Sequence, residues 1–235
     1  RSAVYRRFHL LADWAKPDAA GIRYILRLGI PIGFTIFVEA SMFSVIALFL
    51  APLGPVIVAG HQIALNVVSL VFMLPLSIGM ALTLRVSFLV GAKAPDTARL
   101  IARSSLILAS AVALIFAVLL FVFAEGIAAL YTGEQDVQSV TVTLLVYAAF
   151  FQIADVIQVT CISALRGYKD TSIPMFIMLF SFWGVGLPLG WVLTFTDWLL
   201  PAMGAAGFWV GLTGGLASAS ILLGLRLFLY SPKPE

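Results

Sequence analysis

The sequence predicts an all-α integral membrane protein with six transmembrane helices. Three observations support this: 62% of the 235 residues are hydrophobic, 11% are charged, and the apolar residues form six long runs separated by short polar breaks. About a quarter of the residues in a soluble domain are charged, and the mean hydropathy of this chain is +1.08. The composition therefore favours a membrane protein over a soluble one.

The six apolar runs set the expected spans. These are residues 22–50, 56–91, 98–124, 137–165, 173–195 and 205–229. The breaks between them contain turn residues such as Pro, Gly and Asp. We expect a basic cytoplasmic linker at 1–21, a six-helix transmembrane lobe at 22–230 and a cytoplasmic tail at 231–235. The linker is either a helix lying on the membrane surface or a solvated tail. Because the chain starts with Arg1 and no signal peptide precedes the first span, we expect a fragment of a longer protein.

The basic residues fall on one side of the predicted membrane. All 14 Lys and Arg lie at one of four places: around the start of the first span, at the second connection, at the fourth connection, or at the end of the last span and beyond it. The other connections contain no Lys or Arg, and their acids are Glu125, Glu134, Asp136 and Asp197. Lys and Arg concentrate in cytoplasmic loops. The pattern predicts a multi-pass protein of the inner (plasma) membrane with both ends of this segment in the cytoplasm.

Two acidic side chains lie inside the predicted spans. Glu39 is in the middle of residues 29–50, which carry no other charge, and Asp155 is in the fourth span. Their sequence distances from Arg27 and Arg166 place both carboxylates about 16–18 Å from the same membrane face. An ionised side chain at this depth costs at least a few kcal/mol. We therefore expect both acids to face one polar cavity.

Two carboxylates in one low-dielectric cavity cannot both stay ionised without a cation. Either a metal cation lies between Glu39 and Asp155, or at least one of them carries a proton. Oxygen ligands suit a hard cation such as Na⁺. We predict a coupling-ion site at these two acids, with Na⁺ or H⁺ as the ion and no other cofactor. Gln152 and Gln158, three residues to either side of Asp155, orient it or line the same cavity. The alternative is that each acid only accepts hydrogen bonds from a neighbouring helix.

The second span contributes three polar side chains. Gln62 and Asn66 are four residues apart and share one helix face. They either line a water-accessible cavity in the outer half of the span or hydrogen-bond to a neighbouring helix. His61 is expected to be an interface residue rather than a proton carrier.

Aromatic and small residues indicate a lining and a packing pattern. Phe43 and Phe72 belong to an aromatic and Met-rich set that accommodates flat lipophilic cations, although such residues more often face lipid or the core. The spacings Gly186-xxx-Gly190 and Gly207-xxx-Gly211 predict close packing of the last two spans. Bends are expected at the intramembrane prolines Pro31, Pro75, Pro174 and Pro188.

Patterns for other functions are missing from the sequence. It contains no metal-binding His/Cys cluster, no nucleophile with a paired base and no phosphate-binding loop. No basic and aromatic stretch resembles a surface that binds nucleic acid. The single cysteine, Cys161, excludes an internal disulfide.

The order of residues resembles a known family. GIPIGFTIFVEASMF and LGPVIVAGHQIALNVVSLVFMLPLSIGMALTLRVSFLVGA are similar to helices seven and eight of multidrug and toxic compound extrusion (MATE) transporters. ALRGYKDTSIPM resembles the loop between their helices ten and eleven, and GLPLGWVLTF with GAAGFWVGLTGGL resembles their last two helices. The similarity covers about residues 22–230. It implies the C-terminal six-helix lobe of a twelve-helix MATE-type transporter, with the N-terminal lobe as its partner.

The resemblance also implies roles for individual residues. In the NorM-like branch, which has an acid on both helices, Glu39 and Asp155 fall on the positions of the coupling-ion site. One departure is Phe151, where some sodium-coupled members have Tyr, so that a ligand oxygen is missing. The predicted substrate-binding residues are Phe43, Gln62, Asn66, Phe72 and Glu134. Glu134, with Asp136, lies on the outer loop and either attracts cationic compounds or is a solvated acidic turn.

The predicted function is multidrug efflux by Na⁺- or H⁺-coupled antiport of lipophilic cationic compounds across the inner membrane. The expected partners are these small molecules, membrane lipids and the N-terminal lobe, with no nucleic acid. One alternative is a lipid or lipid-precursor flippase of related fold, which should have more cationic residues in its cavity. A less favoured alternative is an intramembrane lipid-modifying enzyme, which would need a nucleophile or metal beside the acids.

Overall fold

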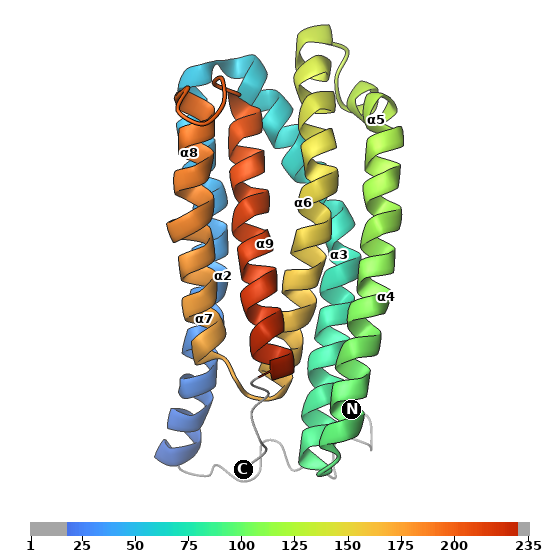
Figure 1. The fold of residues 1–235 in the computed structure, drawn as a ribbon, viewed down its shortest axis with the longest axis vertical. Coiled ribbons are helices and arrows are strands. Elements are labelled where there is room, and N and C mark those ends of the chain that lie inside the picture. The colour runs from blue at the N-terminus through green and yellow to red at the C-terminus, as the bar shows by residue number, and fades with distance from the viewer. Residues whose placement is uncertain (1–17, 230–235) are drawn as a thin grey trace, which may run out of the picture.

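The structure, a computed structural model, describes residues 18–229 as a bundle of helices with no strand among them (Figure 1). Six helical stretches are long and apolar enough to cross a membrane: Ala19–Leu53, Pro55–Gly91, Pro95–Val122, Gln135–Gly167, Ser172–Phe195 and Ala205–Leu229. The predicted fold class, an all-α multi-pass membrane protein, is confirmed. Most of the predicted linker and all of the predicted tail lie outside the described residues.

The first two spans begin with capping residues that the sequence supplies. Helix α2, Ala19–Leu50, begins three residues before the predicted span, because Asp18 accepts hydrogen bonds from the amides of Ala20 and Gly21 at 3.0 Å each. A 3₁₀ turn, Ala51–Leu53, leads to α3, Pro55–Gly91. Proline suits the first position of α3, because an amide N–H at this position would have no partner within the helix.

The middle of the chain contains one helix that we did not predict. Helix α4, Pro95–Val122, is followed by the short helix α5, Ala124–Tyr131, and then by α6, Gln135–Gly167. We expected residues 125–136 to form a connection. The eight residues of α5 are too few to span a membrane. Ala124 and Ala128 of this helix are buried against the bundle.

The fifth span is not a uniform α-helix. It consists of α7, Ser172–Leu179, the π-helical segment η2, Phe180–Gly186, and α8, Leu187–Phe195. Pro188 has no amide to donate, and the amide of Leu187 donates to the carbonyl of Phe182, five residues back. By contrast, Pro31 and Pro75 are buried within α2 and α3 without ending either helix. The last span is α9, Ala205–Leu229.

Helices α3 and α6 are parallel neighbours in a constant register. The Thr83 hydroxyl donates to the Ser163 carbonyl at 2.8 Å, and four residues later Ser87 donates to Gly167 at 3.3 Å; each pair is separated by 80 residues. At the other end of the pair, a Cβ added to Gly60 would lie 2.6 Å from Val140, which is also 80 residues away. Residues 80 apart therefore lie at about the same height along these two helices.

The predicted close packing of the last two spans is confirmed. A Cβ added to Gly211 of α9 would meet the backbone of Gly190 in α8 and would lie 2.6 Å from the carbonyl oxygen of Gly186. A Cβ added to Gly207 would lie 2.6 Å from the backbone of Leu193 and Thr194. Glycine at these positions lets the two backbones touch.

The charged residues divide the bundle into two ends. The start of α2, the α3–α4 turn, the α6–α7 loop and the end of α9 lie together at the bottom of Figure 1. We call this the basic end; its described cations are Arg23, Arg27, Arg85, Lys93, Arg99, Arg103, Arg166, Lys169 and Arg226. The opposite, acidic end carries Glu125, Glu134, Asp136 and Asp197. The separation of charge is as predicted, and its orientation to the cytoplasm stays a prediction.

Candidate functional site

Four aromatic side chains from four helices form a connected layer inside the bundle. Phe43 of α2 meets Phe151 of α6 edge to face, with ring centroids 6.3 Å apart. Phe151 meets Trp209 of α9 at 5.6 Å, and Trp209 meets His61 of α3 at 5.9 Å. The indole N–H of Trp209 donates to Nδ1 of His61 at 3.2 Å. His61 is therefore a buried contact between α3 and α9.

The two intramembrane acids lie beside this aromatic layer. Glu39 precedes Phe43 by four residues on α2, and Asp155 follows Phe151 by four on α6. The two helices run in opposite directions (Figure 1), so both acids fall one turn from the aromatic layer on the side of the basic end. The two carboxylates are close enough to interact electrostatically. Asp155 is 4% exposed, and Glu39 is half-buried.

Arg166 is a neighbour of Glu39 that the sequence analysis missed. This residue belongs to the last turn of α6 and interacts electrostatically with Glu39. The sequence analysis used it only as a marker of the membrane face. Side chains on a helix tilt toward its N-terminus, which on α6 is toward the middle of the span, so the long arginine side chain carries its charge in the direction of Glu39. The direction of α6 was the signal that could have indicated this contact.

The two glutamines that flank Asp155 have different environments. Gln158 is buried and donates to the thioether sulfur of Met178 in α7 at 3.1 Å. Gln152 is completely buried, and neither polar atom of its amide has a hydrogen-bond partner among the described residues. Gln152 therefore does not orient Asp155 by a hydrogen bond. The register of α3 and α6 puts Gln152 at the height of Phe72.

The other predicted substrate-binding residues lie nearer the acidic end. Gln62 and Asn66 are both exposed on α3, and the Tyr131 hydroxyl of α5 donates to Oδ1 of Asn66 at 2.8 Å. By the α3–α6 register, Asn66 is about 13 Å along the helix axis from the height of Asp155. Glu134 is exposed at the acidic end, just before α6, and its carboxylate makes no capping hydrogen bond. Phe43, one turn from Glu39, and Phe72, at the height of Gln152, are the predicted substrate residues whose heights lie nearest to the acids.

A metal ion at the two acids would need further oxygen ligands. Among the described residues, no group of three or more His, Cys, Asp and Glu side chains is placed to hold a metal. Two carboxylates alone can hold a proton. They can hold a hard cation only together with further oxygen ligands from water, hydroxyl groups or carbonyl groups. The cavities of about 1000 Å³ at the basic end and about 280 Å³ at the acidic end are lined by other residues. The common chamber that we predicted is therefore not formed within this lobe by either of these cavities.

Comparison with known proteins places this geometry in a family. The MatE family model matches residues 31–192. The chain is 44% identical to a probable multidrug resistance protein NorM of Idiomarina loihiensis, over 98% of the chain and 50% of that protein. It is 44% identical to the multidrug resistance protein PmpM of Pseudomonas aeruginosa, over 97% of the chain and 48% of that protein.

Solved structures share the fold. The eukaryotic MATE transporter AtDTX14 matches with a TM-score of 0.84 at 22% identity, over 96% of the chain and 51% of that protein. The Vibrio cholerae MATE transporter VcmN in its bent form matches with a TM-score of 0.81 at 19% identity, over 94% of the chain and 50% of that protein. The chain spans about half the length of the curated relatives it matches. Because the family model covers well over half of these 235 residues, the chain belongs to the MatE family.

Proposed function

We propose that this chain is the C-terminal lobe of a multidrug efflux antiporter in the inner membrane, with its basic end in the cytoplasm. The complete protein exchanges Na⁺ or H⁺, moving inward, for lipophilic cationic compounds, moving outward. Membership of the MatE family and the names of the relatives support the class of protein. The observation that carries the mechanism is that Glu39 and Asp155 lie close enough to interact electrostatically, each one helical turn from an aromatic layer.

The acid pair is the element that responds to the ion. Two like charges that are close together and shielded from water repel each other strongly. A proton on one carboxylate or a sodium ion between both removes the repulsion. Arg166 supplies a partial counter-charge for Glu39 from the basic end. The acid pair can therefore exist with or without a bound ion, and the two forms favour different packing of the helices.

The aromatic layer is the element that responds to the substrate. Phe43 is partly buried against Phe151 and offers an aromatic surface to a flat cationic compound. A compound bound there lies within one helical turn of Glu39. Gln62 and Asn66 line the path toward the acidic end, Phe72 lies deeper on α3, and Glu134 attracts cations at the mouth of this path.

Coupling requires that the ion and the drug favour opposite-facing states of the protein. Pro31 lies two turns before Glu39 in α2, and its carbonyl accepts a hydrogen bond from the Thr35 hydroxyl at 2.8 Å. This proline leaves α2 able to bend when the charge on Glu39 changes. Loading of the acids selects one packing of α2, and the drug is released from the aromatic layer in that packing.

The other half of the transporter covers the open face of α2. Glu39 is only half-buried in this lobe, and the nearby Phe34 and Phe37 are 40% and 63% exposed. A half-buried acid inside a membrane span fits cover by a second lobe better than cover by lipid, because the cost of a charge in lipid is high. The transport cavity then lies between the two lobes, and this lobe alone does not transport.

Dye efflux from vesicles that contain the complete protein tests the proposal. Glu39→Gln and Asp155→Asn should each reduce efflux at least about tenfold without loss of expression, because either change fixes the charge of the pair. Glu125→Gln, which neutralises an exposed acid at the acidic end, is the matched control and should transport normally. Sodium and pH gradients imposed separately identify the coupling ion. Normal efflux by both acid variants would refute the coupling role of the pair.

A further inference from the structure

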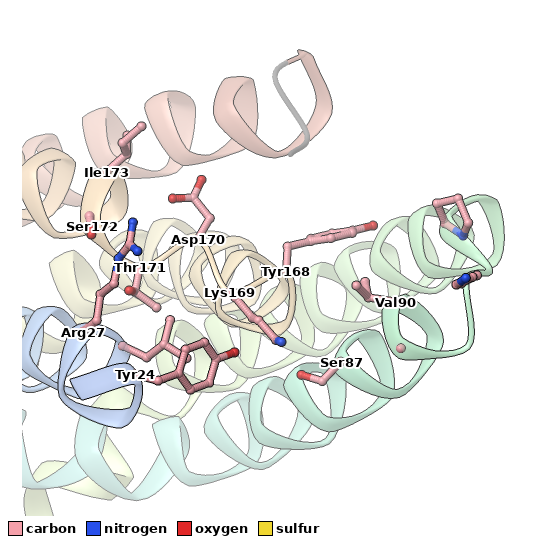
Figure 2. A pocket seen from close by; sticks show the side chains of 14 residues that line it. Tyr24, Arg27, Ser87, Val90, Tyr168, Lys169, Asp170, Thr171, Ser172 and Ile173 are labelled. Carbon is pink, nitrogen blue, oxygen red and sulfur yellow. The ribbon is translucent and has the colours of Figure 1, made fainter. Parts of the chain in front are cut away.

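A cavity at the basic end is lined by residues other than the acid pair. It has a volume of about 1000 Å³ and is formed where the start of α2, the end of α3 and the α6–α7 loop meet (Figure 2). Its charged lining residues are Arg27, Lys93, Lys169 and Asp170. The predicted transport function uses none of these residues.

The cavity has an excess of positive charge. Its described lining includes three cations and one acid, Asp170, and that acid is already bonded to Arg226 of α9 at 2.9 Å. Arg226 does not line the cavity. Figure 2 shows Arg27 beside Thr171 and Ser172, and Lys169 beside Tyr24. The uncompensated charge selects an anion.

Both lysines occupy backbone positions that suit glycine. Lys93 has φ of 56° and Lys169 has φ of 64°, in the left-handed region that most side chains disfavour. Each ends a long helix with the same pair of hydrogen bonds: the Lys93 and Ala94 amides donate to Val90 and Leu89, and the Lys169 and Asp170 amides donate to Arg166 and Leu165. Glycine is the usual residue at this position. The lysines contribute positive charge here in spite of their backbone conformation.

Neighbouring groups hold the Lys169 side chain in place and add hydrogen-bond donors to the cavity. The ammonium group of Lys169 lies 5.4 Å from the centre of the Tyr24 ring, which holds the side chain against α2. Thr171, Ser172 and Ile173 also line the cavity at the start of α7, and the Thr171 side chain makes no capping hydrogen bond. The first amides of a helix have no partner within the helix and favour an anion. The cavity therefore combines cationic side chains with N–H and O–H donors.

We propose that this cavity binds the phosphate group of an anionic phospholipid from the membrane leaflet at the basic end. The cavity lies where the membrane spans end, which is the depth of lipid head groups, and its wall includes the apolar side chains Leu28, Val90 and Ile173. Basic pockets between transmembrane helices bind anionic head groups in this way. The apolar wall contacts the first carbons of the acyl chains, which a free phosphate lacks. Three uncompensated cations select phosphatidylglycerol over the zwitterionic phosphatidylcholine.

Native mass spectrometry of the complete transporter in detergent, titrated with phosphatidylglycerol, measures this binding independently of transport. Lys93→Gly and Lys169→Gly remove the charge and suit the left-handed backbone, so both variants should keep the melting temperature of the parent. Each should weaken the first lipid-binding step about fivefold, and the double variant about twenty-five-fold. Arg99→Gln with Arg103→Gln removes two cations of the basic end that do not line the cavity, and should change binding less than about twofold.

Two further arms identify the ligand. Phosphatidylcholine should bind at least about tenfold more weakly than phosphatidylglycerol, and inorganic phosphate at the same concentration should not displace the lipid. Displacement by phosphate at matching concentration would overturn the lipid assignment in favour of a free phosphate. Unchanged lipid binding in the double glycine variant would overturn the site itself. A lower melting temperature with unchanged lipid binding would show that the lysines contact the rest of the transporter instead.

Discussion

Phe43 and Phe151 meet edge to face with ring centroids 6.3 Å apart, and each lies four residues from an acid on its own helix. Because α2 and α6 are antiparallel, this one contact fixes the height at which Glu39 and Asp155 face each other. The two pairs form successive layers, aromatic toward the acidic end and ionisable toward the basic end. A substrate on the rings and an ion on the acids are therefore close enough to influence each other.

Neutralising the acid pair should stabilise the protein in a non-additive way. At alkaline pH, Glu39→Gln and Asp155→Asn should each raise the melting temperature of the complete protein, since either substitution removes the repulsion between the two carboxylates. The double variant should gain little more, with a coupling free energy of about 1 kcal/mol or above, as for other residues in contact. Thermal unfolding in detergent measures this. Two independent, additive gains would show that the carboxylates do not interact.

The electrostatic interaction between Arg166 and Glu39 predicts a second non-additive pair. Arg166→Gln should lower the free energy of unfolding by about 1–2 kcal/mol, because Glu39 then lacks its counter-charge. The same substitution in a Glu39→Gln background should cost much less. Arg99→Gln, which neutralises an exposed arginine of α4, is the control in both backgrounds. An equal cost of Arg166→Gln with and without the Glu39 carboxylate would show that the two side chains do not interact.

The spans could be predicted because the membrane imposes their length and composition. A run of apolar residues between polar breaks fixes each helix to within a few residues, and the two acids could be placed by counting residues from basic ones. The glycine spacings predicted the contact between α8 and α9 for a similar reason, since only glycine permits such an approach. These features depend on local sequence alone.

The features that the sequence did not predict depend on tertiary packing. The π-helical segment Phe180–Gly186 and the short helix Ala124–Tyr131 are as apolar as the spans beside them, so composition gives no sign of either. The approach of Arg166 to Glu39 requires knowing which face of α6 turns toward α2. The basic cavity is formed by residues from segments that are far apart in the chain, and no single stretch of sequence encodes it.

The buried amide of Gln152 should lower the thermal stability of the protein. A completely buried amide with no hydrogen-bond partner among the described residues is unfavourable by about 1–3 kcal/mol, and leucine has a similar volume. Gln152→Leu should therefore raise the melting temperature of the complete protein. If the amide serves transport near Asp155, dye efflux should fall in the same variant. Gln158→Leu is the control: it removes the bond to Met178 and should not stabilise. A lower melting temperature for Gln152→Leu would contradict the prediction.

Gly211→Ala should separate α8 from α9. The added methyl group would meet backbone atoms of Gly190 and the carbonyl of Gly186, and backbone cannot move aside as the end of a flexible side chain can. We expect a loss of about 1–3 kcal/mol, the range for overpacked sites. Gly224→Ala in the same helix is the matched control, because nothing lies within 4 Å of its added Cβ. That substitution should be neutral or slightly stabilising, since alanine favours the helix. Thermal unfolding of the complete protein compares the two, and equal melting temperatures would refute the direct contact between these backbones.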